Sequence, residues 1–276
     1  MAPRKKSNTI ASLLLPIRLC IGRRLFGTVS RHGVKVSRRR LIKGPCDESE
    51  LAAMEYVAKH TSIPIPKVYN SFRHADRIYI EMEFVRGTDL QAAWLHGLLT
   101  PEQKQQLLTE ISGYIDQMRS LKPPHPEAVG SASPVVGKCL DHRIGSWPFG
   151  PFQKHEEFHS FLRRNLALEY STASFGQEVT DCHSRQYRSC FTHADICARN
   201  IIIENGKVAA IIDWETAGWY PEYWEYTKAH FVRLEMSDWY EGLESLLHRY
   251  DDELKAERAL WRRCDTPGDT VVAHYQ

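Results

Sequence analysis

The stretch from Phe191 to Trp219, FTHADICARNIIIENGKVAAIIDWETAGW, constrains the fold of this chain more than any other part of it. It contains two short apolar runs that are joined through Asn205-Gly206. Asn-Gly between two apolar runs is the strongest local signal for a tight β-hairpin, in which the second strand returns antiparallel to the first. We therefore expect the residue after the second strand to lie beside the loop that precedes the first strand.

Three polar side chains occupy the two places that this hairpin brings together. Asp195 and Asn200 precede the first strand, and Asp213 follows the second. Carboxylate and amide oxygens are the hard ligands that Mg²⁺ prefers, and a carboxylate can also act on a substrate proton. In phosphoryl transfer, a loop Asp orients the attacking hydroxyl, and an Asn about five residues later and a further Asp hold the metal ions. The spacing fits that template, and the alternative is a solvated loop with acidic residues placed by chance.

On these residues the chain resembles the aminoglycoside phosphotransferase (choline kinase-like) superfamily. Its catalytic loop reads H-G-D-x-x-x-x-N, and its metal site reads I-D-W-E or I-D-F-E. The run AGWYPEYWEY that follows IIDWE is similar to the fungal branch of that superfamily. The chain departs from the pattern at Ala194, where the family has Gly, and at Cys197, where it often has Pro or His. An Ala at this position is strained if the backbone has a positive φ.

The resemblance implies a bilobal, protein kinase-like α+β fold with a small, mostly antiparallel-sheet N-lobe and a larger, mainly helical C-lobe. The expected division is a basic N-terminal segment at residues 1–26, a nucleotide-binding N-lobe at residues 27–86, and a C-lobe at residues 87–276. The C-lobe would hold the catalytic loop, the metal site and the substrate region. Composition predicts a short helix over Leu13–Phe26. Two strands and a turn then follow, and they end in the strand RLIK, Arg40–Lys43.

Lys43 and Glu50 are the expected phosphate-binding pair of the N-lobe. Asp47 is a plausible N-cap, and the apolar residues after it have helical spacing, so Glu50 lies in the first turn of a helix. The resemblance implies that a strand lysine binds the α- and β-phosphates and that a helix glutamate holds the lysine. The alternative is that Glu50 only completes a capping box and that Lys43 is a surface cation.

The segment RIYIEMEFV, residues 77–85, predicts another strand. Its end, MEFVRG, is similar to the connector between the lobes of kinase-like folds. The adenine ring would bond there to backbone groups near Glu83 and Val85, so the identity of the side chains carries little information. The alternative is an ordinary edge strand. No diagnostic glycine loop for the phosphates is identifiable, and Gly27 and Gly33 are its candidates.

Two segments of the C-lobe offer more than one interpretation. Residues 123–151 are rich in Gly, Pro and Ser, and we expect a long loop that is functional or mobile. The aromatic residues of 219–226 either line the substrate or pack beneath the catalytic loop, and we favour packing. The resemblance implies that Glu225 bonds to backbone near His193, which would itself brace the loop.

Several further polar residues are weaker candidates. Three histidines have no metal-ligand spacing and are expected at the surface or in packing: His155, His159 and His183. Three acidic residues would suit a cationic acceptor, or are solvated surface charges: Glu215, Glu222 and Glu235.

Composition excludes some classes of protein. A net charge of +2 argues against a protein that only binds nucleic acid, although no Asp or Glu precedes Asp47. Seven cysteines without a C-x-x-C pair fit free thiols in a reducing compartment, and we expect a cytoplasmic protein. The acid-free, Arg-rich N-terminus is also compatible with a mitochondrial targeting peptide or a poor signal-peptide core, and we favour a docked segment. No apolar run reaches the roughly 18 residues of a membrane-spanning helix.

We therefore expect an ATP- and Mg²⁺-dependent phosphotransferase that phosphorylates a hydroxyl of a small molecule. Asp195 would be catalytic, Asn200 and Asp213 would bind metal, and the nucleotide would contact the N-lobe residues named above. One alternative is a catalytically silent kinase-like protein that binds a nucleotide or a partner. Another is a nucleic-acid or anionic-membrane binder, which would need aromatics among its charges, whereas only Phe26 precedes Asp47. The expected partner is a small molecule, without nucleic acid and without a membrane span, and the resemblance implies no particular acceptor.

Overall fold

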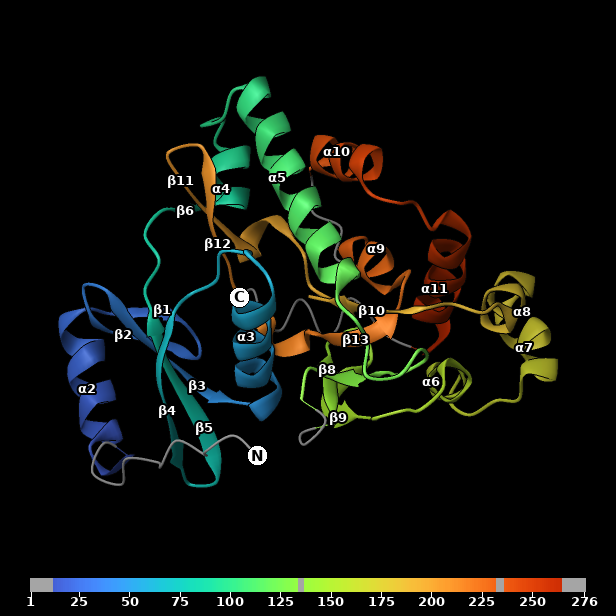
Figure 1. Cartoon of the computed structure of the whole chain (residues 1–276), viewed down its shortest axis with the longest axis horizontal. Helices are drawn as coiled ribbons and strands as arrows, with labels where there is room; N and C mark the ends of the chain where they lie inside the picture. The colour runs from blue at the N-terminus through green and yellow to red at the C-terminus, as the bar shows by residue number, and fades with distance from the viewer. Residues whose placement is uncertain (1–11, 134–136, 232–235, 265–276) are drawn as a thin grey trace.

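The computed structural model describes residues 12–133, 137–231 and 236–264 of the chain. Its N-terminal part is built on an antiparallel sheet, and the rest is mainly helical with short strands between the helices (Figure 1). This arrangement confirms the predicted α+β fold. Within the described ranges, no helix is both long and apolar enough to cross a membrane.

The N-terminal sheet has five strands in the order β1-β2-β3-β5-β4, and all neighbours are antiparallel. The strands are β1 (Thr28–Ser30), β2 (Gly33–Ser37), β3 (Arg40–Cys46), β4 (Val68–His74) and β5 (Arg77–Glu83). The prediction of two strands that end at Lys43 was wrong. Three strands are present, and the third continues to Cys46 because Lys43 and Cys46 pair with Ile80 and Ile78 of β5.

Two helices cover the two faces of this sheet, α2 (Leu15–Leu25) and α3 (Glu48–His60) (Figure 1). Side chains of a strand point alternately to either face. On one face, Leu15 of α2 packs with Ile42 and Phe72, and on the other, Met54 of α3 packs in the main core with Ile80. The predicted N-terminal helix is therefore present and is docked on the sheet.

The C-terminal part contains the remaining helices. They are α4 (Leu90–Leu95), α5 (Pro101–Ser120), α6 (His155–Leu162), α7 (Leu168–Phe175), α8 (Gln177–Ser184), α9 (Trp224–Ala229), α10 (Ser237–Leu246) and α11 (Asp251–Cys264). Residues 123–151 are not a plain loop, since their described part forms the short strands β7 (Gly130–Ser131), β8 (Cys139–Asp141) and β9 (Gly145–Phe149). The aromatic run is buried, with Tyr220, Tyr223 and Trp224 fully enclosed, so packing is confirmed as its role.

The central hairpin is present as β11 (Ile201–Glu204) and β12 (Lys207–Ile211). Asn205 and Gly206 have φ of 52° and 75°, the pair of left-handed residues that a tight hairpin turn requires. The short strand β6 (Thr88–Asp89), which follows the N-terminal sheet, pairs with β11. A Cβ at Gly87 would lie 2.2 Å from the Ile203 carbonyl oxygen, so only glycine permits this close approach. The hairpin is thereby joined to the chain that leaves the N-terminal sheet.

Candidate active site

The loop that carries Asp195 is held in a left-handed turn by a buried carboxylate. It follows β10 (Ser189–Thr192), which pairs with β13 (Gly218–Pro221). Ala194 has φ of 61°, so the strain expected for a non-glycine residue is present at this position. Glu225 accepts hydrogen bonds from the His193 and Ala194 N–H groups at 2.6 and 3.0 Å, as the resemblance implied. Burial raises the pKa of Glu225 to about 7, although these N–H donors oppose the shift.

His193 connects this loop to the end of the hairpin. Its Nδ1 accepts from the Asp195 N–H at 3.2 Å, so its Nε2 donates to the Ile212 carbonyl at 3.0 Å. Burial lowers the pKa of His193, which favours the neutral ring that this pattern needs. The ring also meets the edge of Trp214. His193 therefore braces the loop, as predicted.

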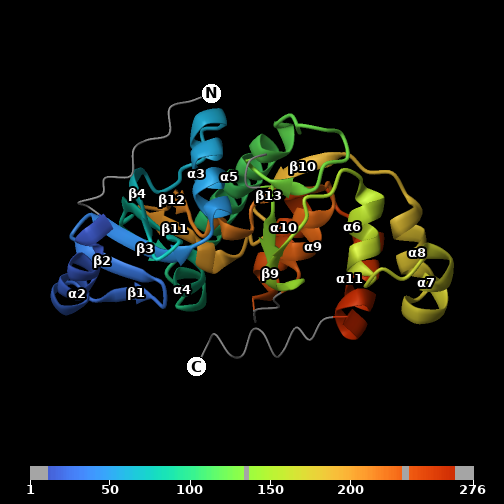
Figure 2. The ribbon, with the colours of Figure 1, turned by 90° about the horizontal axis from the view of Figure 1, so that it is seen from below.

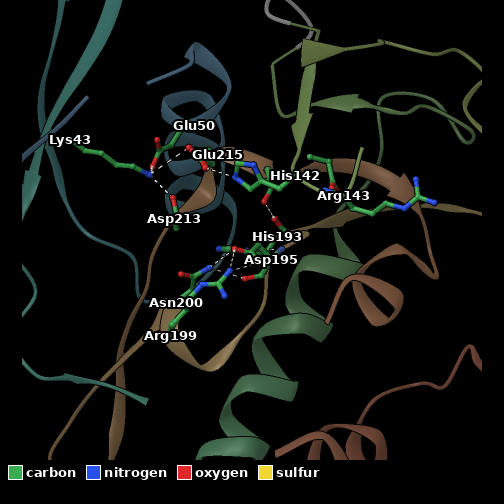
Figure 3. Close-up of polar contacts among 12 residues, drawn as sticks. Lys43, Glu50, His142, Arg143, His193, Asp195, Arg199, Asn200, Asp213 and Glu215 are labelled. Carbon is green, nitrogen blue, oxygen red and sulfur yellow. Dashed lines mark hydrogen bonds and ion pairs between the residues drawn. The ribbon is translucent and has the colours of Figure 1, made fainter. Parts of the chain in front are cut away.

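Two neighbours on the loop orient the Asp195 carboxylate (Figure 3). The Asn200 side-chain amide donates to the Asp195 carbonyl at 3.0 Å and to its carboxylate at 2.8 Å. Arg199 donates to both carboxylate oxygens at 3.3 and 3.4 Å. Arg199 was not among the predicted site residues. The sequence feature that indicates this contact is the spacing of four residues between Asp195 and Arg199, which lets the two side chains meet across one turn.

Lys43 crosses from the N-terminal sheet to the hairpin. Its Nζ lies 2.6 Å from Glu50 and 2.5 Å from Asp213, a residue 170 positions away in the sequence (Figure 3). Asp47 is the N-cap of α3 but makes no side-chain cap bond, so Glu50 pairs with Lys43 rather than with a capping partner. The contact predicted between Lys43 and Glu50 is therefore present.

Burial and neighbouring charges shift the pKa values of Lys43 and Glu50 in opposite directions. Burial alone would lower the pKa of Lys43, but Glu50, Asp213 and Glu215 raise it well above its ordinary value. Burial raises the pKa of Glu50 to about 7 even though Lys43 opposes it, because the Glu50 side chain is only 1% exposed. The Lys43 ammonium group thus compensates the negative charges of Glu50, Asp213 and Glu215.

Two oxygens near this group remain for a metal ion. The Asn200 backbone carbonyl accepts from the Ile212 N–H at 2.9 Å, which places Asn200 beside the segment that leads into Asp213. The amide oxygen of Asn200 and one carboxylate oxygen of Asp213 have no partner among the described residues. Those residues contain no cluster of three or more His, Cys, Asp or Glu side chains that could hold a metal by themselves. Such a small oxygen set fits Mg²⁺, which keeps several waters and binds through one or two protein oxygens plus phosphates.

His142 reaches the same group from the turn between β8 and β9. Its Nε2 lies 2.8 Å from Glu215, which in turn lies 4.0 Å from the Lys43 Nζ. The hydrogen bond to Glu215 raises the pKa of His142, while burial opposes the shift. His142 was missed by the sequence analysis because it lies in the segment that was expected to be a loop.

Buried ion pairs on both sides hold His142 in place. Asp141 accepts from Lys228 at 2.7 Å, and Arg143 lies 2.8 Å from Glu257. All four of these side chains are almost completely buried. Figure 3 shows His142 directed toward Glu215 and Lys43, and Arg143 directed away from them. The sequence signal for this arrangement is the run Asp-His-Arg, in which the outer charges enter the core and the histidine does not.

The predicted adenine contacts lie at the end of β5. This strand ends at Glu83 rather than at Val85, because the next amide, that of Phe84, bonds to the Arg39 carbonyl outside the ladder. The Glu83 N–H donates to the Lys67 carbonyl at 2.9 Å. Within the described part of the chain, the Val85 N–H has no protein acceptor.

The weaker candidates have other partners. Glu222 lies 3.0 Å from Arg188 and 3.7 Å from Arg119, and Glu235 falls outside the described residues. Of the two positions expected for the three further histidines, surface or packing, packing is confirmed: all three are buried, and burial lowers the pKa of each. They belong to the packing of the C-terminal helices: His155, His159 and His183.

Comparison with known proteins gives one family match and several similar folds. A family model described as "Phosphotransferase enzyme family" matches residues 46–265, which include Glu50, Asp195, Asn200 and Asp213. A thermostable mutant of aminoglycoside phosphotransferase APH(4)-Ia in its apo form is 15% identical, with a TM-score of 0.60 over 88% of this chain and 84% of that chain. The ternary complex of that enzyme with AMP-PNP and hygromycin B is 15% identical, with a TM-score of 0.59 over 93% and 92% of the two chains.

A second enzyme shares the fold. The GDP and kanamycin complex of APH(2″)-IIIa is 11% identical, with a TM-score of 0.58 over 94% of this chain and 90% of that chain. Likeness at these identities concerns the fold alone. A search of curated protein sequences gave no match.

Proposed function

The chain belongs to the phosphotransferase enzyme family, and from this membership we propose that it transfers the terminal phosphoryl group of ATP, with Mg²⁺, to a hydroxyl of a small molecule. One observation carries the proposal. Lys43 of the N-terminal sheet meets Glu50 and Asp213 at 2.6 and 2.5 Å, and the oriented Asp195 lies in the loop beside the same hairpin. Phosphoryl transfer depends on positioning and electrostatic stabilisation, and this group supplies both kinds of side chain.

Each residue of the group has a task in this proposal. Asp195 accepts a hydrogen bond from the acceptor hydroxyl and takes its proton, while Asn200 and Arg199 keep the carboxylate in one orientation. Asn200 and Asp213 would hold the metal through the oxygens that have no partner among the described residues. The bound metal ion would neutralise charge on the phosphate oxygens.

The N-lobe residues bind the nucleotide. Lys43 binds the α- and β-phosphates, which replace Asp213 as its partner, while Glu50 keeps the ammonium group in place. The adenine ring bonds to the Val85 N–H and to backbone at Glu83.

The acceptor is assigned only as a hydroxyl compound. Two of the similar structures contain an aminoglycoside, hygromycin B in one and kanamycin in the other. However, two acids that would suit a cationic acceptor already have partners here, Glu215 with His142 and Glu222 with Arg188 and Arg119. For this reason we do not extend the aminoglycosides of those structures to this chain.

The test separates nucleotide binding from transfer. ATP turnover is measured with a panel of amines, sugars and alcohols for the parent, for Asp195→Asn and for the control Asp116→Asn, an exposed residue of α5. Loss of general-base assistance should lower turnover of Asp195→Asn by at least about a hundredfold. The control should match the parent.

A thermal-shift measurement completes the test. ATP with Mg²⁺ should stabilise both the parent and Asp195→Asn, by about 2.7 kcal/mol at a hundredfold excess over Kd. An Asp195→Asn variant as active as the parent would exclude Asp195 as the catalytic base. Absence of any nucleotide shift in the parent would refute the proposed function as a whole.

A further inference from the structure

The outer face of α2 combines apolar and basic side chains that the proposed catalysis does not use. We propose that this face docks the protein on the surface of an anionic phospholipid membrane. We call its apolar residues the α2 stripe: Leu14, Ile17, Ile21 and Leu25. Membrane docking is independent of the proposed function, because it requires neither nucleotide nor catalysis.

The α2 stripe lies on one side of a helix whose other side is firmly packed. Residues three or four positions apart share a helix face, so the stripe is continuous. On the opposite side, Leu15 is fully buried against the sheet, and a Cβ at Gly22 would lie 2.7 Å from the Lys35 carbonyl oxygen. Arg18 further anchors the helix through a bidentate pair with Glu81 at 2.7 and 3.0 Å. The stripe is therefore exposed although the helix itself is docked.

The exposure of the α2 stripe is unusual within this molecule. Leu14, Ile17, Ile21 and Leu25 are 46%, 55%, 51% and 70% exposed. Leu13, Phe26 and Val29, which lie just before and after α2 in the sequence, are exposed as well. Elsewhere in the described part, large exposed apolar side chains occur singly or as the neighbouring pair Leu95 and Leu98. A contiguous exposed apolar patch marks a surface that binds a partner or a membrane.

The charges around the α2 stripe fit an anionic partner. Every charged residue of α2 is an arginine, and no acidic residue precedes Asp47. Arg23 and Arg24 are exposed, and no carboxylate of the described residues pairs with them. Both also line an open groove of about 560 Å³ between α2 and the β4–β5 hairpin, with Leu15, His74 and Tyr79. The groove therefore lies on the Leu15 side of α2, and Arg24, three residues after Ile21, is the exposed cation that borders the α2 stripe. Guanidinium groups bind phosphate oxygens well, while aliphatic side chains enter the boundary of the acyl chains.

Other occupants fit this surface less well. Nucleic acid binds to cations interleaved with aromatic rings, whereas the centre of the α2 stripe is aliphatic. A second copy of the chain would bring Arg23 and Arg24 close to identical charges, which disfavours self-association. A membrane accepts both the aliphatic stripe and its basic margin. The exposed aliphatic side chains here take the place of the aromatics that were expected among the charges of a membrane binder.

The position of α2 leaves the active site accessible. Figure 2 shows α2 at one end of the molecule, beyond the N-terminal sheet and away from the hairpin β11–β12. A membrane in contact with the α2 stripe would therefore touch the end of the molecule opposite to α7 and α8. Docking would set where the enzyme works without covering its catalytic loop.

The experiment is co-sedimentation of the full chain with lipid vesicles. Vesicles of phosphatidylcholine alone are compared with vesicles that contain phosphatidylserine at about one third of the lipid, at low and at high salt. We expect binding only to the anionic vesicles, and weaker binding at high salt because screening weakens the arginine contacts. Ile17→Ser/Ile21→Ser should weaken binding at least about tenfold. Arg23→Gln/Arg24→Gln should weaken it about thirtyfold, since each basic residue near an anionic surface contributes about 1 kcal/mol.

Matched controls keep the result specific. Leu95→Ser/Leu98→Ser removes exposed apolar side chains elsewhere, and Arg258→Gln/Arg262→Gln removes exposed cations of α11. Both controls should bind vesicles as the parent does, and circular dichroism melting confirms that every variant folds. Equal loss in the controls would show that binding is not specific to the α2 stripe and would overturn the proposal.

Three further outcomes would overturn it and identify another occupant. A concentration-dependent dimer that Ile17→Ser/Ile21→Ser abolishes, without vesicle binding, would assign the stripe to a second copy. Binding to RNA or DNA with no binding to anionic vesicles would assign the arginines to nucleic acid. Vesicle binding that occurs only after removal of residues 1–11 would assign the stripe to that segment of the chain.

Discussion

Replacing Lys43 by Met tests whether one ammonium group compensates the buried carboxylates of the site. Methionine keeps the length of the side chain but removes its charge. Glu50, at 1% exposure, then loses the cation that it contacts at 2.6 Å, and Asp213 loses its partner at 2.5 Å. Glu50 must take up a proton or remain as an unpaired buried charge, and both cost folding free energy.

The loss of unfolding free energy caused by Lys43→Met should depend on pH. Breaking a buried pair typically costs about 3–5 kcal/mol, and we expect the lower end because Lys43 is 17% and Asp213 38% exposed. In the variant, burial holds the pKa of Glu50 above its value in the unfolded chain, so folding becomes less favourable as pH rises through that range. The free energy of unfolding should therefore fall further below that of the parent at about pH 8 than at about pH 5.

Urea unfolding at these two pH values measures the effect, with the double variant Lys43→Met/Glu50→Gln as the second arm. The double variant leaves no charge at position 50, so it should recover part of the loss, with a coupling energy of about 1–3 kcal/mol. Additive effects, or a loss below about 1 kcal/mol for Lys43→Met at both pH values, would refute the reasoning.

Three smaller perturbations test other parts of the structure by urea unfolding. Ala194→Gly removes a left-handed strain of about 1–2 kcal/mol but increases the freedom of the unfolded chain by about 0.4–1 kcal/mol. A net gain of about 0–1.6 kcal/mol is therefore expected, and a loss would contradict the strain. Glu215 raises the pKa of His142, so the ion pair between them stabilises the folded protein. This stabilisation is complete below about pH 6.5 and is lost as the pH rises through the pKa of His142 in the folded protein. His142→Gln should therefore be less stable than the parent in acid and equally stable at high pH. A constant difference would contradict that linkage. Leu15→Ala should cost about 2–5 kcal/mol and Ile17→Ala under about 0.5 kcal/mol, and equal losses would contradict the packing of α2.

The fold class and the local plan of the site could be predicted from the sequence. Asn205-Gly206 between two apolar runs specified the hairpin, because turn geometry depends on adjacent residues. Asp195 and Asn200 lie together for the same reason, since both belong to one short loop. The strand that carries Lys43 was also predicted, but its end was placed at Lys43. Pairing of β3 with β5 extends the strand to Cys46.

The contacts between distant segments were decided only by the tertiary structure. Glu50 could equally have been a capping residue, and it pairs with Lys43 because the helix packs with that carboxylate buried. Asp141 pairs with Lys228 and Arg143 with Glu257 inside the core, and this leaves His142 beside Glu215.

Burial is likewise a property of the assembled fold. The Leu13–Phe26 helix was anticipated, but not which of its sides would remain in solvent; packing on the sheet buries Leu15 and exposes Ile17 two residues later. Spacing along the chain determines which residues share a turn or a helix face. Desolvation and long-range pairing depend on what packs against that face, and that partner lies elsewhere in the sequence.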